Sequence, residues 1–244
     1  MNESKQCVAI LGAGPGLGQA LAREYGIRGH AVALVARRIE PLQALCADLA
    51  QEGIEAAAFS ADFRPSADNM QRLFAAIRGR FGEVHALYYG PNAPEAFTAA
   101  ATLTVADVQD KMDLFLYGLM DAVAQVLPDM RRRQAGSILV GLGGSAIHGM
   151  PYMSGPGPAL AAARNYLHSL HGEMAREGIH VGMLVLSAVI RQSGWHTAMA
   201  SGAVRFDLPP GFSIPEIEPH ELAARLLAFA DARQAAELIY PPMP

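Results

Sequence analysis

Apolar and polar positions form two alternating patterns along this chain. Largely apolar runs, which are typical of strands buried on both faces of a sheet, occupy residues 8–11, 30–36, 84–89, 137–140 and 179–186. Segments with apolar residues three and four positions apart, which are typical of helices, occupy residues 17–25, 39–52, 65–81, 104–133, 159–177 and 221–232. Two weaker strand patterns lie at 55–63 and 237–240.

The regular alternation of these segments defines the expected architecture, because it is typical of a parallel sheet with helices on both faces. We therefore predict an α/β protein, a single Rossmann domain over residues 1–244 with a doubly wound parallel sheet of about seven strands. Residues 187–219 contain Pro and Gly, interrupt the alternation and are expected to form a lid over a substrate. A bend is expected near Pro128, because proline removes an intrahelical hydrogen-bond donor.

A glycine-rich turn joins the first strand to the first helix. Glycine allows a sharp turn, a close approach of a diphosphate to the backbone, and tight packing of the helix on the strand. The free N–H groups at the start of the helix would then face the phosphates. The alternative is a flexible glycine loop, but the strand, helix and second strand around this turn favour a dinucleotide site. The residues expected to bind the cofactor here are Gly12, Gly14, Gly16, Leu17 and Gly18.

Two arginines, Arg37 and Arg38, follow the second strand. Sites that prefer NAD usually have an acidic residue there, which accepts hydrogen bonds from the ribose 2′-OH. Two guanidinium groups can instead hold a 2′-phosphate, through charge-assisted hydrogen bonds of about 1.5–3 kcal/mol each. The pair therefore predicts NADP(H) as the cofactor, the alternative being two solvated charges at the start of a helix.

Composition excludes several classes of function. The 244 residues are 51% hydrophobic and 17% charged, and the net charge of −4 gives no basic surface for nucleic acid. Apolar segments are too short to span a membrane, and no secretory signal pattern precedes the first strand. Cys7 and Cys46 give neither a disulfide framework nor a metal-ligand spacing. We expect a cytoplasmic protein without a metal, whose partner is a small-molecule substrate or ligand.

The order and spacing of these elements resemble the short-chain dehydrogenase/reductase family over essentially the whole chain. The resemblance implies an oxidoreductase of Rossmann fold that binds a nicotinamide cofactor. It also implies that Asp62 and Phe63 bind the adenine and that Gly90, after the fourth strand, belongs to the cofactor site. The residues that carry it are Gly12-x-x-x-Gly16-x-Gly18, the arginine pair, Asp62-Phe63, and the segments 127–130, 136–140 and 172–181.

The family's chemistry implies four proton-handling side chains, an Asn, a Ser, a Tyr and a Lys, and this sequence departs from all four. Counted from the flanking matches, their positions hold Phe115, Gly143, Pro156 and Leu160. No Tyr-x-x-x-Lys occurs, because no lysine follows Lys111. Positioned acid–base groups contribute roughly 10²–10⁴-fold in rate, so ordinary carbonyl reduction by the family's mechanism is not expected.

Substitute groups stand near these positions. Ser145 and Tyr152 could reach the nicotinamide if the loop that carries them is shifted, and they are the candidate catalytic residues. A tyrosine has an ordinary pKa near 10, and no cation is evident to lower it, so Tyr152 could equally be a packing residue. The replacements by Gly, Pro and Leu leave a roomy, apolar floor that suits a bulky apolar ligand.

Two interpretations of function remain open. The first is an NADP(H)-dependent oxidoreductase with an atypical active site, whose substrate is an activated C=C bond or an iminium carbon. The second is a catalytically inactive NADP(H)-binding sensor or partner subunit, a pseudoenzyme. The resemblance and the alanine-rich faces of the helices at 104–133 and 159–177 also imply a homo-oligomer, a dimer or tetramer.

Overall fold

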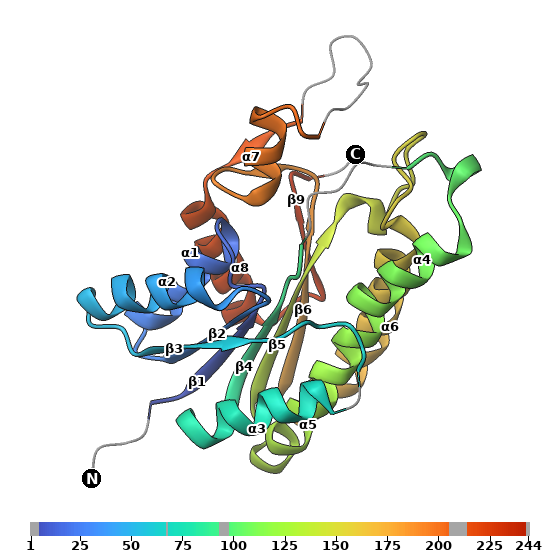
Figure 1. Ribbon diagram of the computed structural model, residues 1–244. Coiled ribbons are helices and arrows are strands. Elements are labelled where there is room, and N and C mark those ends of the chain that lie inside the picture. The colour runs from blue at the N-terminus through green and yellow to red at the C-terminus, as the bar shows by residue number, and fades with distance from the viewer. Residues whose placement is uncertain (1–4, 67, 93–97, 205–213, 243–244) are drawn as a thin grey trace.

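A seven-stranded parallel sheet forms the centre of the molecule (Figure 1). The computed structural model describes residues 5–66, 68–92, 98–204 and 214–242. The strand order is β3-β2-β1-β4-β5-β6-β9, and every neighbouring pair is parallel. The predicted α/β Rossmann fold is therefore confirmed. The strands are β1 (Cys7–Leu11), β2 (Ala31–Ala36), β3 (Ala56–Ser60), β4 (Val84–Tyr89), β5 (Gly136–Gly143), β6 (Ile179–Leu186) and β9 (Glu237–Tyr240).

Helices cover both faces of the sheet and divide the core in two. Alternate residues of β1 serve the two halves: Val8 and Ile10 pack into one cluster, and Cys7, Ala9 and Leu11 into the other. The first cluster contains α1 (Leu17–Ile27), α2 (Ile39–Gln51) and α8 (Pro219–Ala232), and the second contains α3 (Asn69–Phe81), α5 (Gly118–Arg133) and α6 (Gly157–Met174). Figure 1 shows these two sets on opposite sides of the sheet.

Strand order places the candidate site. From β1 the chain runs outward through β2 and β3, and it then returns to the other side of β1 as β4. Open α/β sheets bind ligands beside the carboxyl ends of the strands at such a reversal, which are β1 and β4 here, and we call this region the crevice. The glycine-rich turn follows β1 directly, so it lies at this crevice.

The segment predicted as one helix over 104–133 is divided. It contains α4 (Val105–Met112), a π-helical turn (Asp113–Tyr117) and α5, and α5 continues through Pro128. The irregular turn is fixed by the buried hydroxyl of Tyr89, which donates a hydrogen bond of 2.5 Å to the carbonyl oxygen of Leu114. Long-range packing against β4 therefore sets the break, which the local pattern could not show.

The segment 187–219 carries secondary structure that the pattern did not predict. Its described part forms β7 (Val189–Ile190), α7 (Gly194–Ala200) and β8 (Glu216–Ile217), and β7 pairs with β8 in a separate parallel ribbon. Residues 205–213 lie outside the described residues. Three 3₁₀ turns complete the description: η1 (Ala100–Thr102), η3 (Gly144–Ala146) and η4 (Ala175–Glu177).

The described ranges contain neither a membrane-spanning helix nor a metal-binding cluster. No helix there is long and apolar enough to cross a membrane. No group of three or more His, Cys, Asp or Glu side chains in the same ranges is arranged to hold a metal ion.

Candidate active site

The glycine-rich turn has a conformation that requires glycine. Gly12 and Gly16 have φ angles of +107° and +93°, in the region that side chains rarely adopt. A Cβ atom on Gly18 would lie 2.3 Å from the carbonyl oxygen of Gly12, and one on Gly12 would lie 2.4 Å from that of Gly90. The turn is thus pressed against the end of β4 on one side and against α1 on the other.

Gly14 is different, because a Cβ atom there would have no neighbour within 4 Å. Its backbone borders open space at the start of α1. The first turn of α1 contains no acidic residue, and its N-cap residue, Gly16, supplies no side-chain hydrogen bond. The first amide groups and the positive end of the helix are therefore available to phosphate oxygens. Leu17 itself is buried and anchors the helix in the core.

Arg37 and Arg38 are both exposed and follow β2, the neighbour of β1. The carbonyl oxygen of Arg37 accepts a hydrogen bond of 2.9 Å from the Ser60 hydroxyl, which ties this corner to β3. Because parallel strands end at one edge of the sheet, the two guanidinium groups stand at the same edge as the glycine-rich turn. This arrangement fits a dinucleotide with a 2′-phosphate.

The residues expected around the adenine have different environments. Asp62 is exposed, and its Oδ1 atom accepts a 3.1 Å hydrogen bond from the backbone N–H of Arg64. Phe63 is buried and packs on Tyr89, with 5.7 Å between the ring centroids, so its side chain belongs to the core and only its backbone could reach a cofactor. Gly90 must be glycine, because a Cβ atom there would lie 2.2 Å from the Tyr88 hydroxyl.

Three of the positions that correspond to the family's proton-handling residues lie near one another. Gly143 ends β5, and a Cβ atom on it would lie 3.5 Å from Cδ1 of Leu160, which is buried in α6. Pro156 stands just before Gly157, the first residue of α6. The side chain nearest to Gly143 here is thus the hydrocarbon side chain of Leu160. Phe115 lies in the π-helical turn and packs against the core beneath.

The two candidate catalytic residues differ in their placement. The Ser145 hydroxyl lies 3.8 Å from the point where a Cβ atom on Gly143 would be, so it stands close to the position of the family's Ser. It also lines a cavity of about 250 Å³ with Met153, Ser154 and Pro158. Tyr152 has a φ of +64°, is 79% exposed and is not among the residues that line this cavity.

Residues after β6 cover the crevice, and sequence reasoning missed several of them. A Cβ atom on Gly16 would lie 3.0 Å from Cβ of Ser193, so the loop before α7 touches the glycine-rich turn. Trp195, on α7, donates a 2.8 Å hydrogen bond from Nε1 to Oδ1 of Asn92, in the loop after β4. The Ser187 hydroxyl lies against Gly144. Nothing in the local sequence marks these contacts, because each joins segments distant along the chain.

The fold and the glycine-rich turn define the class of protein, a dinucleotide-binding α/β protein of Rossmann type. A family model described as "short chain dehydrogenase" matches residues 6–195, and the chain belongs to this family.

Several known proteins are similar to the chain. The uncharacterized oxidoreductase Lmo0432 of Listeria monocytogenes is 25% identical over 185 residues, which are 74% of this chain and 72% of the relative. The alcohol dehydrogenase of the archaeon Thermococcus sibiricus, complexed with 5-hydroxy-NADP, superimposes with a TM-score of 0.80 at 21% identity, over 98% of this chain and 99% of the other. The structure of the actinorhodin polyketide ketoreductase with NADPH superimposes with a TM-score of 0.82 at 23% identity, over 98% of this chain and 97% of the other.

Proposed function

We propose that this chain binds NADP(H) at the crevice beside β1 and β4 and is an oxidoreductase for a small, largely apolar molecule, with an atypical active site. The observation that carries the proposal is the glycine-rich turn, whose backbone conformation and uncapped helix start fit a diphosphate. The similarity of the chain to structures that hold NADP or NADPH supports the same cofactor.

The cofactor would be held at three places. Backbone N–H groups of Gly14, Gly16 and Leu17 would bind the diphosphate. Arg37 and Arg38 would bind the 2′-phosphate, and Asp62 would face the adenine. Each arginine contact contributes about 1.5–3 kcal/mol, which is enough to favour NADP(H) over NAD(H) by about tenfold or more. When bound, NADPH supplies a hydride for an electrophilic carbon of the substrate.

The residues around Gly143 decide which substrates suit this site. Leu160 presents a hydrocarbon side chain where the family has a cation, so no group there lowers the pKa of a proton donor. The Ser145 hydroxyl can donate a hydrogen bond to a substrate oxygen, but it is a weak acid. Reduction of an activated C=C bond or an iminium carbon needs less acid assistance than that of a ketone, so these are the proposed substrate classes.

The segment 187–219 is proposed to be the lid. Its described part touches both sides of the crevice, through Ser193 against Gly16 and through the Trp195–Asn92 hydrogen bond. A lid in this position would exclude water from the reacting carbon and hold an apolar substrate against Leu160. Trp195 is the single tryptophan of the chain, so its fluorescence reports on the lid directly.

Exposed apolar residues support the proposal of a homo-oligomer. Val105 in α4, Tyr117 in the π-helical turn and Met120 in α5 are 86%, 39% and 41% exposed. Exposed apolar side chains that form one patch mark sites of protein–protein contact. Light scattering should show a dimer or tetramer, and Tyr117→Asp with Met120→Asp should give monomers. A monomeric wild-type protein would contradict this assignment.

Deuteride transfer tests the catalytic half of the proposal. NADPH deuterated at the reactive carbon is incubated with a panel of activated alkenes and imines, and the products are analysed by mass spectrometry. We expect deuterium in the product with wild-type protein and a rate at least about tenfold lower with Ser145→Ala. Ser169→Ala removes a hydroxyl from the exposed face of α6, outside the cavity that Ser145 lines, and is the matched control that should have no effect. NADPH binding without transfer to any acceptor would instead identify the non-catalytic sensor or partner subunit.

A further inference from the structure

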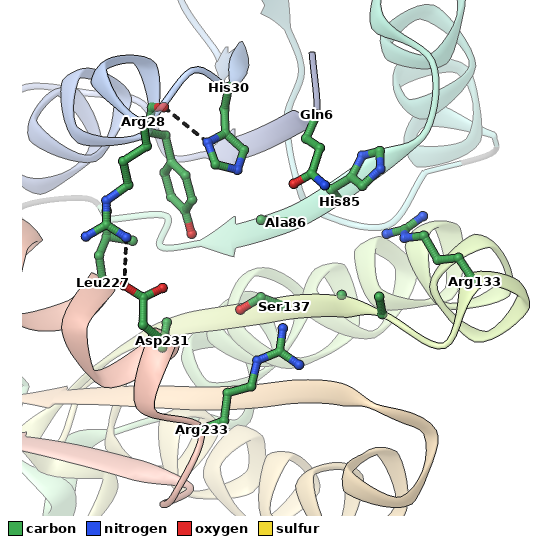
Figure 2. Close-up of a pocket in the computed structure, with 14 residues that line it drawn as sticks. Gln6, Arg28, His30, His85, Ala86, Arg133, Ser137, Leu227, Asp231 and Arg233 are labelled. Carbon is green, nitrogen blue, oxygen red and sulfur yellow. Dashed lines mark hydrogen bonds and ion pairs between the residues drawn. The ribbon is translucent and has the colours of Figure 1, made fainter. Parts of the chain in front are cut away.

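A second cavity lies at the amino-terminal ends of the strands, whereas the crevice lies at their carboxyl ends (Figure 2). Its volume is about 280 Å³. Gln6 precedes β1, His85 and Ala86 begin β4, and Gly136 and Ser137 begin β5, so the cavity opens where these strands start. Because the glycine-rich turn stands where β1 ends, the two sites are separate and can be occupied independently.

Positive charge dominates the lining of this cavity. Arg28, Arg133 and Arg233 line it, and Asp231 is the one carboxylate among the described lining residues. Arg28 and Asp231 form an ion pair at 2.8 Å. Arg133 pairs with Glu83 at 3.1 Å outside the lining, whereas Arg233 donates to the carbonyl oxygen of Gly178 and has no carboxylate partner within the described part of the chain.

Two buried polar atoms of the lining residues also lack partners among the described residues. They are Nε of Arg133 and the hydroxyl oxygen of Ser137. Buried donors nearly always have a hydrogen-bond partner in folded proteins, so these two suggest a partner that the chain itself does not provide. In the view of Figure 2, Ser137 and Arg233 lie on one side of the pocket, His30 and His85 lie on the other, and Arg133 lies beside His85.

The histidines add further donor capacity. Nδ1 of His30 faces the carbonyl oxygen of Tyr25 at 3.2 Å, and Nδ1 of His85 faces that of Glu83 at 3.0 Å. Each Nδ1 therefore carries the hydrogen, and each Nε2 is left for another contact. Either ring can bind an acidic O–H of a ligand when neutral, or donate to an anion when protonated.

We propose that this cavity binds a small phosphorylated molecule. Guanidinium groups recognise phosphate by paired, charge-assisted hydrogen bonds, and three of them line this cavity. Arg28 and Arg133 are each paired with one carboxylate, whereas Arg233 has no carboxylate partner among the described residues. The volume leaves room for a phosphate and a few further heavy atoms.

The competing explanation is that the arginines only stabilise helix ends. Arg28 and Arg233 follow the last residues of α1 and α8, and Arg133 ends α5, where a cation interacts favourably with the helix dipole. That role accounts for the placement of the charges. It does not account for the two orphaned donors, and it predicts no affinity for an anion.

Calorimetric titration with inorganic pyrophosphate, at about 0.15 M salt to screen nonspecific surface binding, separates these explanations. We expect one site at this cavity, with affinity lowered by about tenfold or more in Arg233→Gln. Arg225→Gln removes the same charge from the same helix but outside the cavity, and it should leave the affinity unchanged. Asp231→Asn removes the lining carboxylate and should raise the affinity several-fold, a gain that a misfolded variant could not give.

Pyrophosphate can also bind the glycine-rich turn, so the titration is repeated in the Gly14→Ala variant, in which a methyl group occupies the open space beside that turn. Binding that persists there and responds to Arg233→Gln supports the proposal. Three results would overturn it: no binding in that background, equal loss in Arg233→Gln and Arg225→Gln, or no gain in Asp231→Asn. The proposed oxidoreductase activity is unaffected by any of them, because the two sites share no residue.

Discussion

Substituting two glycines of the same turn should have opposite consequences, and this contrast distinguishes a cofactor site from a merely structural turn. Gly14 borders open space, whereas Gly18 is packed against the backbone of Gly12. If the turn exists to bind a diphosphate, a methyl group at position 14 fills the space that the ligand needs and disturbs nothing else. A methyl group at position 18 disturbs the fold itself.

The magnitudes follow from the geometry. In Gly14→Ala the new Cβ atom meets nothing within 4 Å, so the free energy of unfolding should stay unchanged or rise by about 0.4–1 kcal/mol through the unfolded state. In Gly18→Ala it would lie 2.3 Å from a carbonyl oxygen, and overpacking of this kind costs about 1–3 kcal/mol or more. The gain in helix propensity, about 1 kcal/mol, only partly offsets this cost.

Urea unfolding and NADPH titration of both variants check the contrast. We expect Gly14→Ala to keep its unfolding midpoint and to lose about tenfold or more in NADPH affinity, which corresponds to about 1.4 kcal/mol. Gly79→Ala, at an exposed position of α3 where a Cβ atom also has open space, is the matched control and should change neither cofactor affinity nor packing. Unchanged NADPH affinity in Gly14→Ala would refute the reasoning.

Three further predictions concern stability. Burial lowers the pKa of His180 to about 4, so the folded state resists protonation of this side chain. The free energy of unfolding should therefore fall by up to a few kcal/mol as the pH drops from about 6.5 toward 4. Urea unfolding midpoints should show this fall, and His180→Phe should reduce it. Leu160→Ala should cost about 2–5 kcal/mol in unfolding free energy, because Leu160 is buried in α6. Glu237 accepts hydrogen bonds from Nε and Nη2 of Arg164, at 2.5 and 3.0 Å. A double-mutant cycle with Arg164→Met and Glu237→Gln should give a favourable coupling free energy of roughly 0.5–3 kcal/mol. A coupling of zero would contradict a fixed bidentate pair.

The sequence predicted the fold and the cofactor turn well because both depend on local signals. Apolar runs identified the strands from β1 to β6, and the glycine spacing identified the turn whose φ angles the structure shows. The third strand is shorter than expected, since residues 61–63 leave the sheet and Phe63 turns into the core. The π-helical turn was not predictable, because it depends on the Tyr89 hydroxyl, distant along the chain.

The catalytic region was harder to predict for a physical reason. Its motif is missing, so only counting could place Gly143 and Leu160, and only the folded chain shows that the Ser145 hydroxyl lies beside them. The hydrogen bond between Trp195 and Asn92 joins α7 to the loop after β4, and no pattern in the sequence links the two residues. The roles of Ser145 and Tyr152 and a cytoplasmic location stay predictions.

Calorimetric titration of NADPH and NADH into the wild-type protein and into Arg37→Ala/Arg38→Ala tests the central claim most directly. The account predicts that wild-type protein binds NADPH at least about tenfold more tightly than NADH, and that the double variant loses this preference while still binding NADH. Binding of neither nucleotide by the wild-type protein, or a preference for NADPH that survives in the variant, would contradict it.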